Sequence, residues 1–328
     1  MSYHFRKKLL AASLVAVSSG VIVPALAQSS GSGVMALEEI VVTARRREES
    51  LQDVPITVNA VTSETINDLN VRKLEDIQGI VAGLTLQENT TAPNASLRGV
   101  RFDTFISGNE PTVEFYLNDS PMSPLTVMQA MFDVGQIEVL RGPQGTLRGR
   151  SSPSGSITVT ANGPILDEFG GYIDLTATDL DSQNVRAAVN VPVIEDMLAV
   201  RLAGVWEENT AGDIQNVYTG ERSGRNSDGF RFSVAFEPTD DLSIDLMYQK
   251  LNADRDQFTQ VESANLADPS LPAAAIPISP GDRFAVANAP QSSTQELEAT
   301  VMNISYDMGN HQLNLDASYI DEIIDRPN

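Results

Sequence analysis

The sequence lacks cysteine altogether and contains only two histidines, His4 and His311, in 328 residues. Without cysteine the chain has no disulfide framework and no thiolate metal site. So few histidines disfavour histidine-based catalysis and multi-histidine metal sites. We therefore predict no metal and no cofactor.

Basic residues are also scarce, because 22 lysines and arginines face 44 aspartates and glutamates, for a formal net charge of -22. A nucleic-acid partner is disfavoured, since binding to phosphates needs a basic surface. The chain has neither a Gly-x-Ser-x-Gly elbow nor a histidine-bearing metal motif. The acid pair Asp240-Asp241 lies in a predicted tight turn, where charges are usually solvated. An enzyme is therefore not predicted.

Long apolar runs are absent except near the N-terminus. There, residues 9–23 follow three cations and precede an Ala-x-Ala pattern that ends at Ala27. This order is typical of a secretory signal peptide, predicted as residues 1–27 with cleavage after Ala27. A membrane anchor is the alternative, but the run is short for a spanning helix. An exported chain without such a helix is still able to enter a membrane as a β-barrel.

Residues 28–53 are predicted to be a linker that begins with a flexible Ser/Gly stretch. Within the linker, residues 40–44 are β-prone. A short β-prone segment near a mobile N-terminus is able to add as a strand to the sheet edge of another chain. The alternative, which the segment by itself favours, is an ordinary first strand of the following domain.

The segment of residues 136–160 organises the middle of the chain. Two short runs rich in β-branched residues, 137–140 and 157–160, flank a stretch of glycine, proline and serine. Glycine and proline supply tight turns and positive φ, and the same loop contains Arg141, Arg148 and Arg150. We predict a hairpin with a cationic tip. The alternative is a solvated loop on a soluble α/β domain.

Residues 54–163 alternate short strands with short helices, which predicts a compact mixed α/β domain. Thr62 or Ser63 is predicted to cap the first helix. The predicted helices are 62–70, 72–80 and 127–134, and a turn is predicted at 118–121. The predicted strands are 55–58, 84–86, 96–98, 112–117 and the two strands of the hairpin.

Residues 164–328 show period-two alternation in place of helical spacing. Several of the predicted strands are about ten residues long, which is enough to cross a bilayer as a tilted strand. The predicted strands are 168–178, 184–193, 198–207, 229–237, 243–251, 295–306 and 312–319. In the third strand, the residues predicted to face lipid are Leu198, Val200, Leu202, Gly204 and Trp206. The residues predicted to face water are Ala199, Arg201, Ala203, Val205 and Glu207.

The connections between these strands alternate in length. Residues 192–197, 237–241 and 307–311 are short connections, whereas 210–228 and 252–294 are long and polar. Sorting of this kind is typical of an outer-membrane barrel whose short turns face the periplasm. A soluble β-sandwich, the alternative, does not obviously sort its connections in this way.

Taken in order, these features resemble the TonB-dependent outer-membrane receptors, over essentially the whole chain after the signal peptide. Residues 39–44 resemble the energy-coupling box of that family, and residues 97–99 resemble a short motif of its plug domain. Residues 137–147 resemble the plug's most specific signature, and residues 154–159 resemble the strand that follows it. By this resemblance, the box residues are Glu39, Ile40, Val41, Val42, Thr43 and Ala44. The plug-signature residues are Arg98, Gly99, Arg141, Gly142, Pro143, Gly145 and Gly155. The chain departs from the family at Arg148, at residues 82–84 and at residues 118–120.

The resemblance implies a plug domain followed by antiparallel transmembrane strands of a barrel that has 22 strands in this family. It implies that ligand binds from outside and that the box adds as a strand to TonB, which an inner-membrane complex energises. Arg98 and Arg141 are expected to pair with acidic residues of the barrel. The expected location is the outer membrane of a Gram-negative bacterium, with the N-terminus and plug on the periplasmic side and lipid around the strands. Because only seven strands are readable, we expect an N-terminal fragment of a longer receptor.

The function implied by the resemblance is import of a scarce solute, most often a ferric siderophore in this family. Importers of cobalamin, haem or glycans are the alternatives within the family. The short distance between the cleavage site and the box leaves no room for an extra N-terminal signalling domain, which favours a siderophore-type or other small-ligand receptor. A non-transporting outer-membrane binding or adhesion protein is the alternative of a different class, although it does not account for the box or the plug signature.

Overall fold

A computed structural model describes the protein over residues 40–43, 49–87, 94–100, 111–129, 131–145, 149–178, 182–209, 214–258, 283–287 and 289–326. The predicted signal peptide lies outside these ranges, as do Glu39 and Ala44 of the predicted box. Within the described ranges, no helix is both long and apolar enough to cross a membrane.

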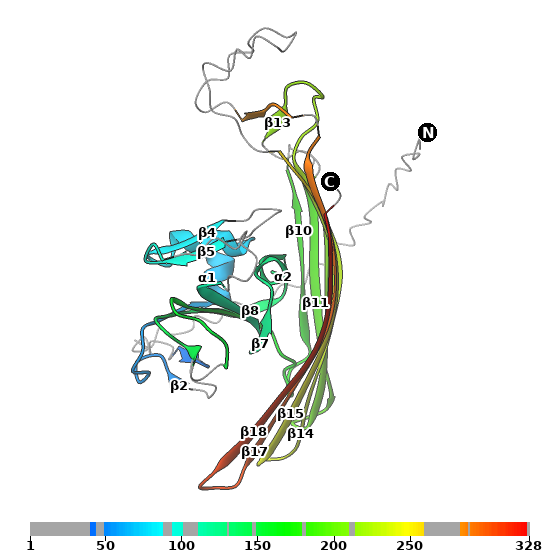
Figure 1. The fold of residues 1–328 in the computed structure, drawn as a ribbon. Helices are drawn as coiled ribbons and strands as arrows, with labels where there is room; N and C mark the ends of the chain where they lie inside the picture. The colour runs from blue at the N-terminus through cyan, green and yellow to red at the C-terminus, as the bar shows by residue number, and fades with distance from the viewer. Residues whose placement is uncertain are drawn as a thin grey trace, which may run out of the picture. The chain divides into compact units, whose positions relative to one another are not determined.

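The part of the chain from β3 to β9, which we call the plug, is built on a five-stranded sheet (Figure 1). Its β8 and β9 pair antiparallel, with Val139 opposite Ile157, so the predicted hairpin is confirmed. β9 and β6 run parallel. The strands lie in the order β3 (Val58–Thr62), β8 (Val134–Arg141), β9 (Gly155–Ala161), β6 (Val113–Leu117) and β7 (Ser120–Met122).

Two further strand pairs accompany this sheet. The strands predicted at 84–86 and 96–98 are present as β4 (Leu84–Gln87) and β5 (Asn94–Leu97), and the structure pairs them with each other. β1 (Val41–Val42) pairs with β2 (Glu49–Ser50). The predicted strand at 55–58 was wrong in position, because pairing with β8 begins only at Val58, opposite Leu140. Pro55 has no N–H to contribute to a ladder.

The helices of the plug are short. α1 (Ser63–Asp68) begins after Thr62, whose hydroxyl accepts a hydrogen bond from the Thr65 N–H at 3.4 Å, so the predicted cap is confirmed. The predicted helix at 72–80 is present as the 3-10 helix η1 (Leu74–Gly79).

The predicted helix at 127–134 was wrong in position, since α2 spans Pro124–Gln129 and Val134 already begins β8. The Ser123 hydroxyl accepts from the Thr126 N–H at 3.2 Å. Proline suits the first turn of a helix, which explains the early start.

The two faces of the five-stranded sheet differ in chemistry, because successive residues of a strand point to opposite faces. One face is apolar and lies in the main core of the protein with η1 and α2; it carries Phe115, Leu117, Ile137, Val139, Ile157 and Val159. The other face is mainly polar and carries Glu114, Tyr116, Glu138, Leu140, Ser156 and Thr158. On this second face Leu140 belongs to a separate small cluster with Val42 and Val54.

A seven-stranded antiparallel sheet, which we call the wall, follows the plug in the sequence, and Figure 1 shows it as one long curved sheet. All seven predicted strands are confirmed, and most are longer than predicted. The strands neighbour one another in the order β10 (Gly170–Ala177), β11 (Ser182–Ile194), β12 (Leu198–Asn209), β14 (Gly224–Thr239), β15 (Leu242–Gln257), β17 (Gln291–Asp307) and β18 (Gln312–Asp325).

The connections that were predicted to be short or long are so, but the connection between β10 and β11, on the rim of the long ones, spans only residues 178–181. β11, β14 and β17 are each followed by a short turn, at 195–197, 240–241 and 308–311. The longer connections contain two strands that the sequence did not reveal, β13 (Gln215–Asn216) and β16 (Phe284–Ala285), which pair in parallel. Each is only two residues long, too short for any periodic signal.

The alternation predicted for β12 is also confirmed. Leu202 and Trp206 are 49% and 43% exposed, whereas Arg201, Ala203 and Glu207 are buried. The buried side is the one that meets the plug, because Arg201 bonds to plug residue Asp133. The inner face of the wall is therefore covered and mixes polar with apolar side chains.

Candidate functional site

The predicted energy-coupling box is docked on the plug in the structure. Val41 lies opposite Ser50 in the β1–β2 pair, and the Ile40 carbonyl accepts from the Leu51 N–H at 2.8 Å. Val42 is fully buried against Val54 and Leu140.

Two side chains of β8 also hold the box. The Thr43 N–H donates to Glu138 Oε1 at 2.7 Å, and the Thr43 hydroxyl donates to the same oxygen at 3.2 Å. Gln136 Nε2 donates to the Val41 carbonyl at 3.1 Å. One buried valine is worth roughly 1.5–3 kcal/mol, and each hydrogen bond adds a net ~0.5–1.5 kcal/mol. The segment is therefore held by a few kcal/mol, and its release is much cheaper than unfolding the plug core.

Replacing Glu138 with alanine is expected to loosen the box. The variant removes the acceptor for the Thr43 N–H, and a bond to a charged group contributes roughly 1.5–3 kcal/mol. Amide hydrogen exchange of residues 40–43 should accelerate by about 10-fold or more, measured by mass spectrometry. Glu138→Gln keeps an amide oxygen at the same place and is the matched control. Unchanged exchange in Glu138→Ala, relative to the parent, would show that this side chain does not hold the segment.

The predicted plug-signature residues are brought together around Ala82 and Gly83. Arg98, at φ 54°, and Gly99, at φ 76°, form the turn after β5, and the Arg98 N–H donates to the Gly83 carbonyl at 2.8 Å. Arg141 ends β8, and its Nη2 donates to the Ala82 carbonyl at 2.6 Å.

The remaining signature residues shape the loop between β8 and β9. Gly142, at φ 89°, donates its N–H to the Ser154 carbonyl at 2.9 Å. Pro143 is exposed and Gly145 is half-buried. Gly155 begins β9 at φ 147°, and a Cβ there would lie 2.1 Å from the Leu140 carbonyl oxygen. Of the arginines predicted at the tip, Arg150 is exposed and Arg148 lies outside the described residues.

The expected pairing of Arg98 and Arg141 with acidic residues of the barrel stays a prediction. Where the plug meets the wall, the structure shows an ion pair of the opposite polarity. The plug contributes the carboxylate of Asp133 and the wall contributes the guanidinium of Arg201. Arg201 Nε donates to Asp133 Oδ2 at 2.8 Å and Arg201 Nη2 to Oδ1 at 2.6 Å. Such a bidentate ion pair fixes the relative orientation of the carboxylate and the guanidinium as well as their distance.

Asp133 is the centre of a buried polar network. Its side chain is 1% exposed and that of Arg201 is 10% exposed. Asn162 Nδ2 also donates to Asp133 Oδ1, at 2.9 Å. Arg231 of β14 donates from Nη1 to the carbonyls of Phe132 and Asp133, at 2.9 and 3.2 Å, and its Cζ lies 4.4 Å from the centre of the Phe132 ring. Two wall arginines therefore converge on the residue that directly precedes β8.

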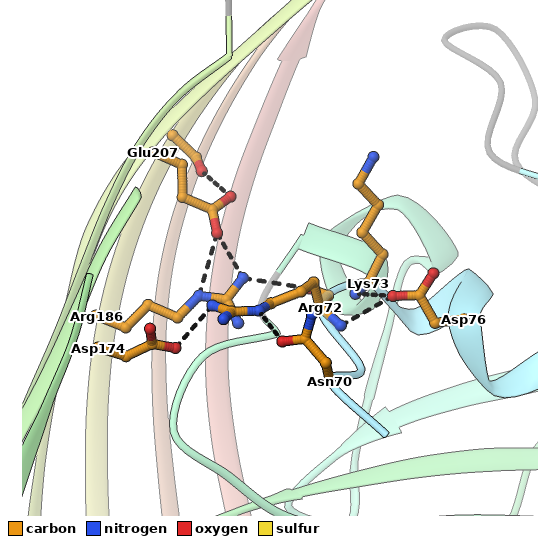
Figure 2. Close-up of polar contacts among 8 residues, drawn as sticks. Asn70, Arg72, Lys73, Asp76, Asp174, Arg186 and Glu207 are labelled. Carbon is orange, nitrogen blue, oxygen red and sulfur yellow. Dashed lines mark hydrogen bonds and ion pairs between the residues drawn. The ribbon is translucent and has the colours of Figure 1, made fainter. Parts of the chain in front are cut away.

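A second group of contacts links the loop before η1 to β10 and β11, and Figure 2 shows its members. Arg72 Nη1 pairs with Asp174 Oδ2 at 2.7 Å, and the two side chains are 30% and 39% exposed. Arg186 donates to the Arg72 carbonyl at 3.2 Å and pairs with Glu207 Oε1 at 2.5 Å. The Arg72 and Lys73 N–H groups both donate to Asp76 Oδ2, at 2.8 and 2.9 Å.

A third group links α2 to β17 and β18. Glu322 Oε1 accepts from the Ser123 hydroxyl at 2.7 Å, from Gln295 Nε2 at 2.7 Å and from the Thr126 hydroxyl. Gln295 Nε2 also donates to the Thr126 hydroxyl at 2.8 Å. The contact between the plug and the wall thus combines hydrogen bonds and ion pairs with apolar packing, since the core of the plug continues into wall residues Leu251, Leu297 and Val301.

Cavities lie between parts of the plug and the wall. One of about 790 Å³ is lined by polar side chains that include Arg72, Asp133, Tyr172, Asp174, Arg186 and Arg201. Another of about 660 Å³ is lined by Thr43 together with Asp245, Ser305 and Gln312. Ser305 and Gln312 flank the turn at 308–311, so the box lies at the end of the wall that carries the short turns. Among the described residues, no group of three or more His, Asp or Glu side chains is arranged to hold a metal ion.

The sequence did not reveal Asp133 and Arg231 as residues that join the plug to the wall. It placed Arg201 correctly on the inner face of β12, but alternation alone does not say what an inner residue meets. Asp133 lies at φ 50° between α2 and β8, in a stretch predicted as helix. No periodic signal marked it, because the residue belongs to neither element.

Comparison with known proteins agrees with this architecture. The sequence model of the TonB-dependent Receptor Plug Domain matches residues 50–156. The pesticin receptor of Yersinia pestis is 27% identical over 203 residues, which is 61% of this chain and 30% of the relative. This chain therefore spans about 30% of the length of the curated pesticin receptors that it matches.

Solved structures share the fold. The ferric yersiniabactin uptake receptor FyuA from Yersinia pestis superposes with a TM-score of 0.70 at 20% identity, over 83% of this chain and 41% of that one. The ferric-catecholate import receptor Fiu from E. coli K12 superposes with a TM-score of 0.67 at 20% identity, over 86% of this chain and 40% of that one. Residues 50–156 therefore match the plug domain of TonB-dependent receptors, and the plug and the wall together share the fold of solved receptors.

Proposed function

We propose that this protein is an outer-membrane receptor that imports a ferric siderophore, with energy delivered by TonB to the segment around Val41 and Val42. The observation that carries the proposal is the position of that segment. It is a short strand at the short-turn end of the wall, held by few contacts and lining a polar cavity. In outer-membrane barrels the short turns face the periplasm, which is the side from which TonB would approach.

The outer face of the wall supports the membrane location. Its strands are 8 to 17 residues long, and most exceed the 9–11 residues that cross a bilayer. The outward side chains of the central strands include a group of apolar and aromatic residues: Leu202, Trp206, Phe230, Phe232, Leu246 and Tyr248. Phe230 and Tyr248 also contact each other, with ring centroids 5.9 Å apart. Aromatic side chains are enriched where such barrels meet the membrane surface.

The mechanism follows from the difference in strength between the few contacts that hold residues 40–43 and the many contacts that hold the plug core. Ligand binds on the extracellular side, and TonB captures the segment of residues 39–44 by adding its own strand. Pulling then breaks the few bonds that hold the segment to Gln136 and Glu138. The plug is displaced in part, and ligand passes through the water-filled interior.

The ferric siderophore is favoured as cargo by the kinds of proteins that this chain resembles. FyuA is a ferric yersiniabactin uptake receptor and Fiu a ferric-catecholate import receptor. The iron belongs to the transported cargo and is not a resident cofactor. A receptor that only binds ligand would need no detachable strand at the periplasmic rim.

The test is uptake in cells that lack the chromosomal copy of the receptor. With iron restricted and single ferric siderophores supplied, the intact receptor should restore growth and radiolabelled iron uptake with one of them. Val41→Pro should abolish uptake while surface binding of ligand persists, because proline removes an N–H from the strand that TonB must pair. Val41→Thr keeps strand propensity at this half-exposed position and is the matched control. Unchanged uptake with Val41→Pro would overturn the energised mechanism. Normal growth of the cells without the receptor on every siderophore would overturn the assigned cargo.

A further inference from the structure

The Arg231 side chain is buried where the wall meets the plug. It lies on β14 directly opposite Gln249 of β15, and Arg231 Nε donates to Gln249 Oε1 at 2.9 Å. Arg231 Nη1 donates to the carbonyls of Phe132 and Asp133, and the Phe132 ring covers one face of the guanidinium. The guanidinium is therefore held by a wall side chain, by plug backbone and by an aromatic ring.

One end of this guanidinium has no partner. Within the described part of the chain, no hydrogen bond is made by Arg231 Nη2 or by Gln249 Nε2, although both atoms are buried. Because the donors of a guanidinium have a fixed fork geometry, Nη2 lies close to the Nε that bonds to Gln249. Two donors without acceptors thus belong to one hydrogen-bonded pair of side chains, and buried donors of this kind are unfavourable.

The charges around Arg231 do not balance. The ionisable groups that act on it are Asp133, Tyr172 and Arg201, and a phenol is neutral near pH 7. Arg201 bonds to both carboxylate oxygens of Asp133, so one carboxylate serves two guanidinium groups. The network therefore has a net positive charge, and a buried charge without a counter-charge is costly.

Arg231 differs in this respect from two other arginines at the same interface. Arg186 pairs with Glu207 of the wall. Arg201 pairs with Asp133 of the plug. Among the residues that the structure describes, none brings a carboxylate to Arg231 as an ion pair of its own. The cavity of about 790 Å³ is lined by Asp133 and Arg201, so small ions in it reach this network without crossing the apolar core.

We propose that Arg231 Nη2 and Gln249 Nε2 bind a small inorganic anion, chloride, and that this anion strengthens the attachment of the plug to the wall. Both groups are N–H donors, which bind anions and not cations. A monovalent anion also cancels the excess positive charge, which a water molecule at the same place does not. Binding of the anion does not depend on the solute that the receptor imports, so this site goes beyond the proposed function.

Bromide soaked into crystals of the purified receptor locates the site, because bromide replaces chloride and scatters X-rays anomalously. We expect an anomalous peak at hydrogen-bond distance from Arg231 Nη2. A water molecule at that place, with no bromide signal, overturns the proposal.

Limited proteolysis of the plug measures the effect of the anion on stability. At constant ionic strength, replacing gluconate by chloride at roughly ten times its dissociation constant should slow cleavage of the parent about 10-fold. Gln249→Glu should remove this response, because a carboxylate there is able to form a bidentate pair with Arg231 and to replace the anion. The plug of this variant should resist protease without chloride as well as the parent plug does with chloride.

Arg231→Met and Arg186→Met form a matched pair of variants. Arg231→Met removes the unbalanced charge and should also abolish the response to chloride. Arg186→Met retains Arg231 and should retain the response, even though it leaves Glu207 without its partner. A response that persists in Arg231→Met or in Gln249→Glu contradicts the proposal, because chloride would then act at another place.

Discussion

Replacing Asp133 with asparagine is expected to lower the free energy of unfolding of the plug by about 3–5 kcal/mol, because removing one partner of a buried pair leaves the other charge uncompensated. Asparagine has nearly the same shape as aspartate and tolerates the positive φ found here. The change therefore isolates the loss of charge beside Arg201 and Arg231. Thermal unfolding of the purified receptor, followed with limited proteolysis of the plug, measures the effect.

Asp174→Asn is the matched control, since Asp174 also joins the plug to the wall. Its pair with Arg72 is partly exposed, at 39% and 30%, whereas the side chain of Asp133 is 1% exposed. Exposed pairs contribute about 0–1 kcal/mol, so this variant should unfold almost as the parent does. Equal losses in both variants would mean that burial does not set the strength of these contacts, and Asp133 would lose its place as the main attachment.

Replacing Gly155 with alanine is expected to prevent stable assembly of the β8–β9 hairpin. Gly155 has φ 147°, which L-residues rarely adopt, and a Cβ would lie 2.1 Å from the Leu140 carbonyl oxygen and 2.7 Å from Leu97 Cδ1. The backbone oxygen cannot move without breaking the ladder. Strain and overpacking together should cost roughly 3–5 kcal/mol. Loss of a protease-resistant plug fragment, at unchanged expression, is the readout.

Gly163→Ala is the matched control for Gly155→Ala. A Cβ at Gly163 would meet nothing within 4 Å, so alanine there should change stability by about 0.5 kcal/mol or less. A folded, protease-resistant plug in Gly155→Ala would contradict the steric argument. It would show that β9 can shift relative to β8 without losing the sheet.

Local signals in the sequence were sufficient for much of the fold. The runs at 137–140 and 157–160, separated by glycine and proline, predicted the hairpin that β8 and β9 form. Strict alternation along residues 198–207 predicted both β12 and its buried face. Each of these signals depends only on neighbours in the chain, so a single sequence is enough to recognise it.

Errors occurred where no such local signal exists. The helix predicted at 127–134 is α2 at Pro124–Gln129, because the cap at Ser123 and the start of β8 at Val134 set its ends. The strand predicted at 55–58 is β3 at Val58–Thr62, because pairing with β8 selects the register. Apolar runs of this length fit a helix or a strand equally well until a partner is present.

The sequence by itself determined the order of elements, the two faces of the wall strands and the resemblance to the plug signature. All three depend on the spacing of residue types along the chain. Only the tertiary structure decided which residues meet. Asp133 and Arg201 are 68 residues apart, and Thr43 and Glu138 are 95 apart. No local sequence pattern indicates either pair, because the packing of elements that are distant in the chain brings a buried carboxylate and its partner together. That packing brings residues 40–43 against β8 and holds the same strand to the wall through Asp133.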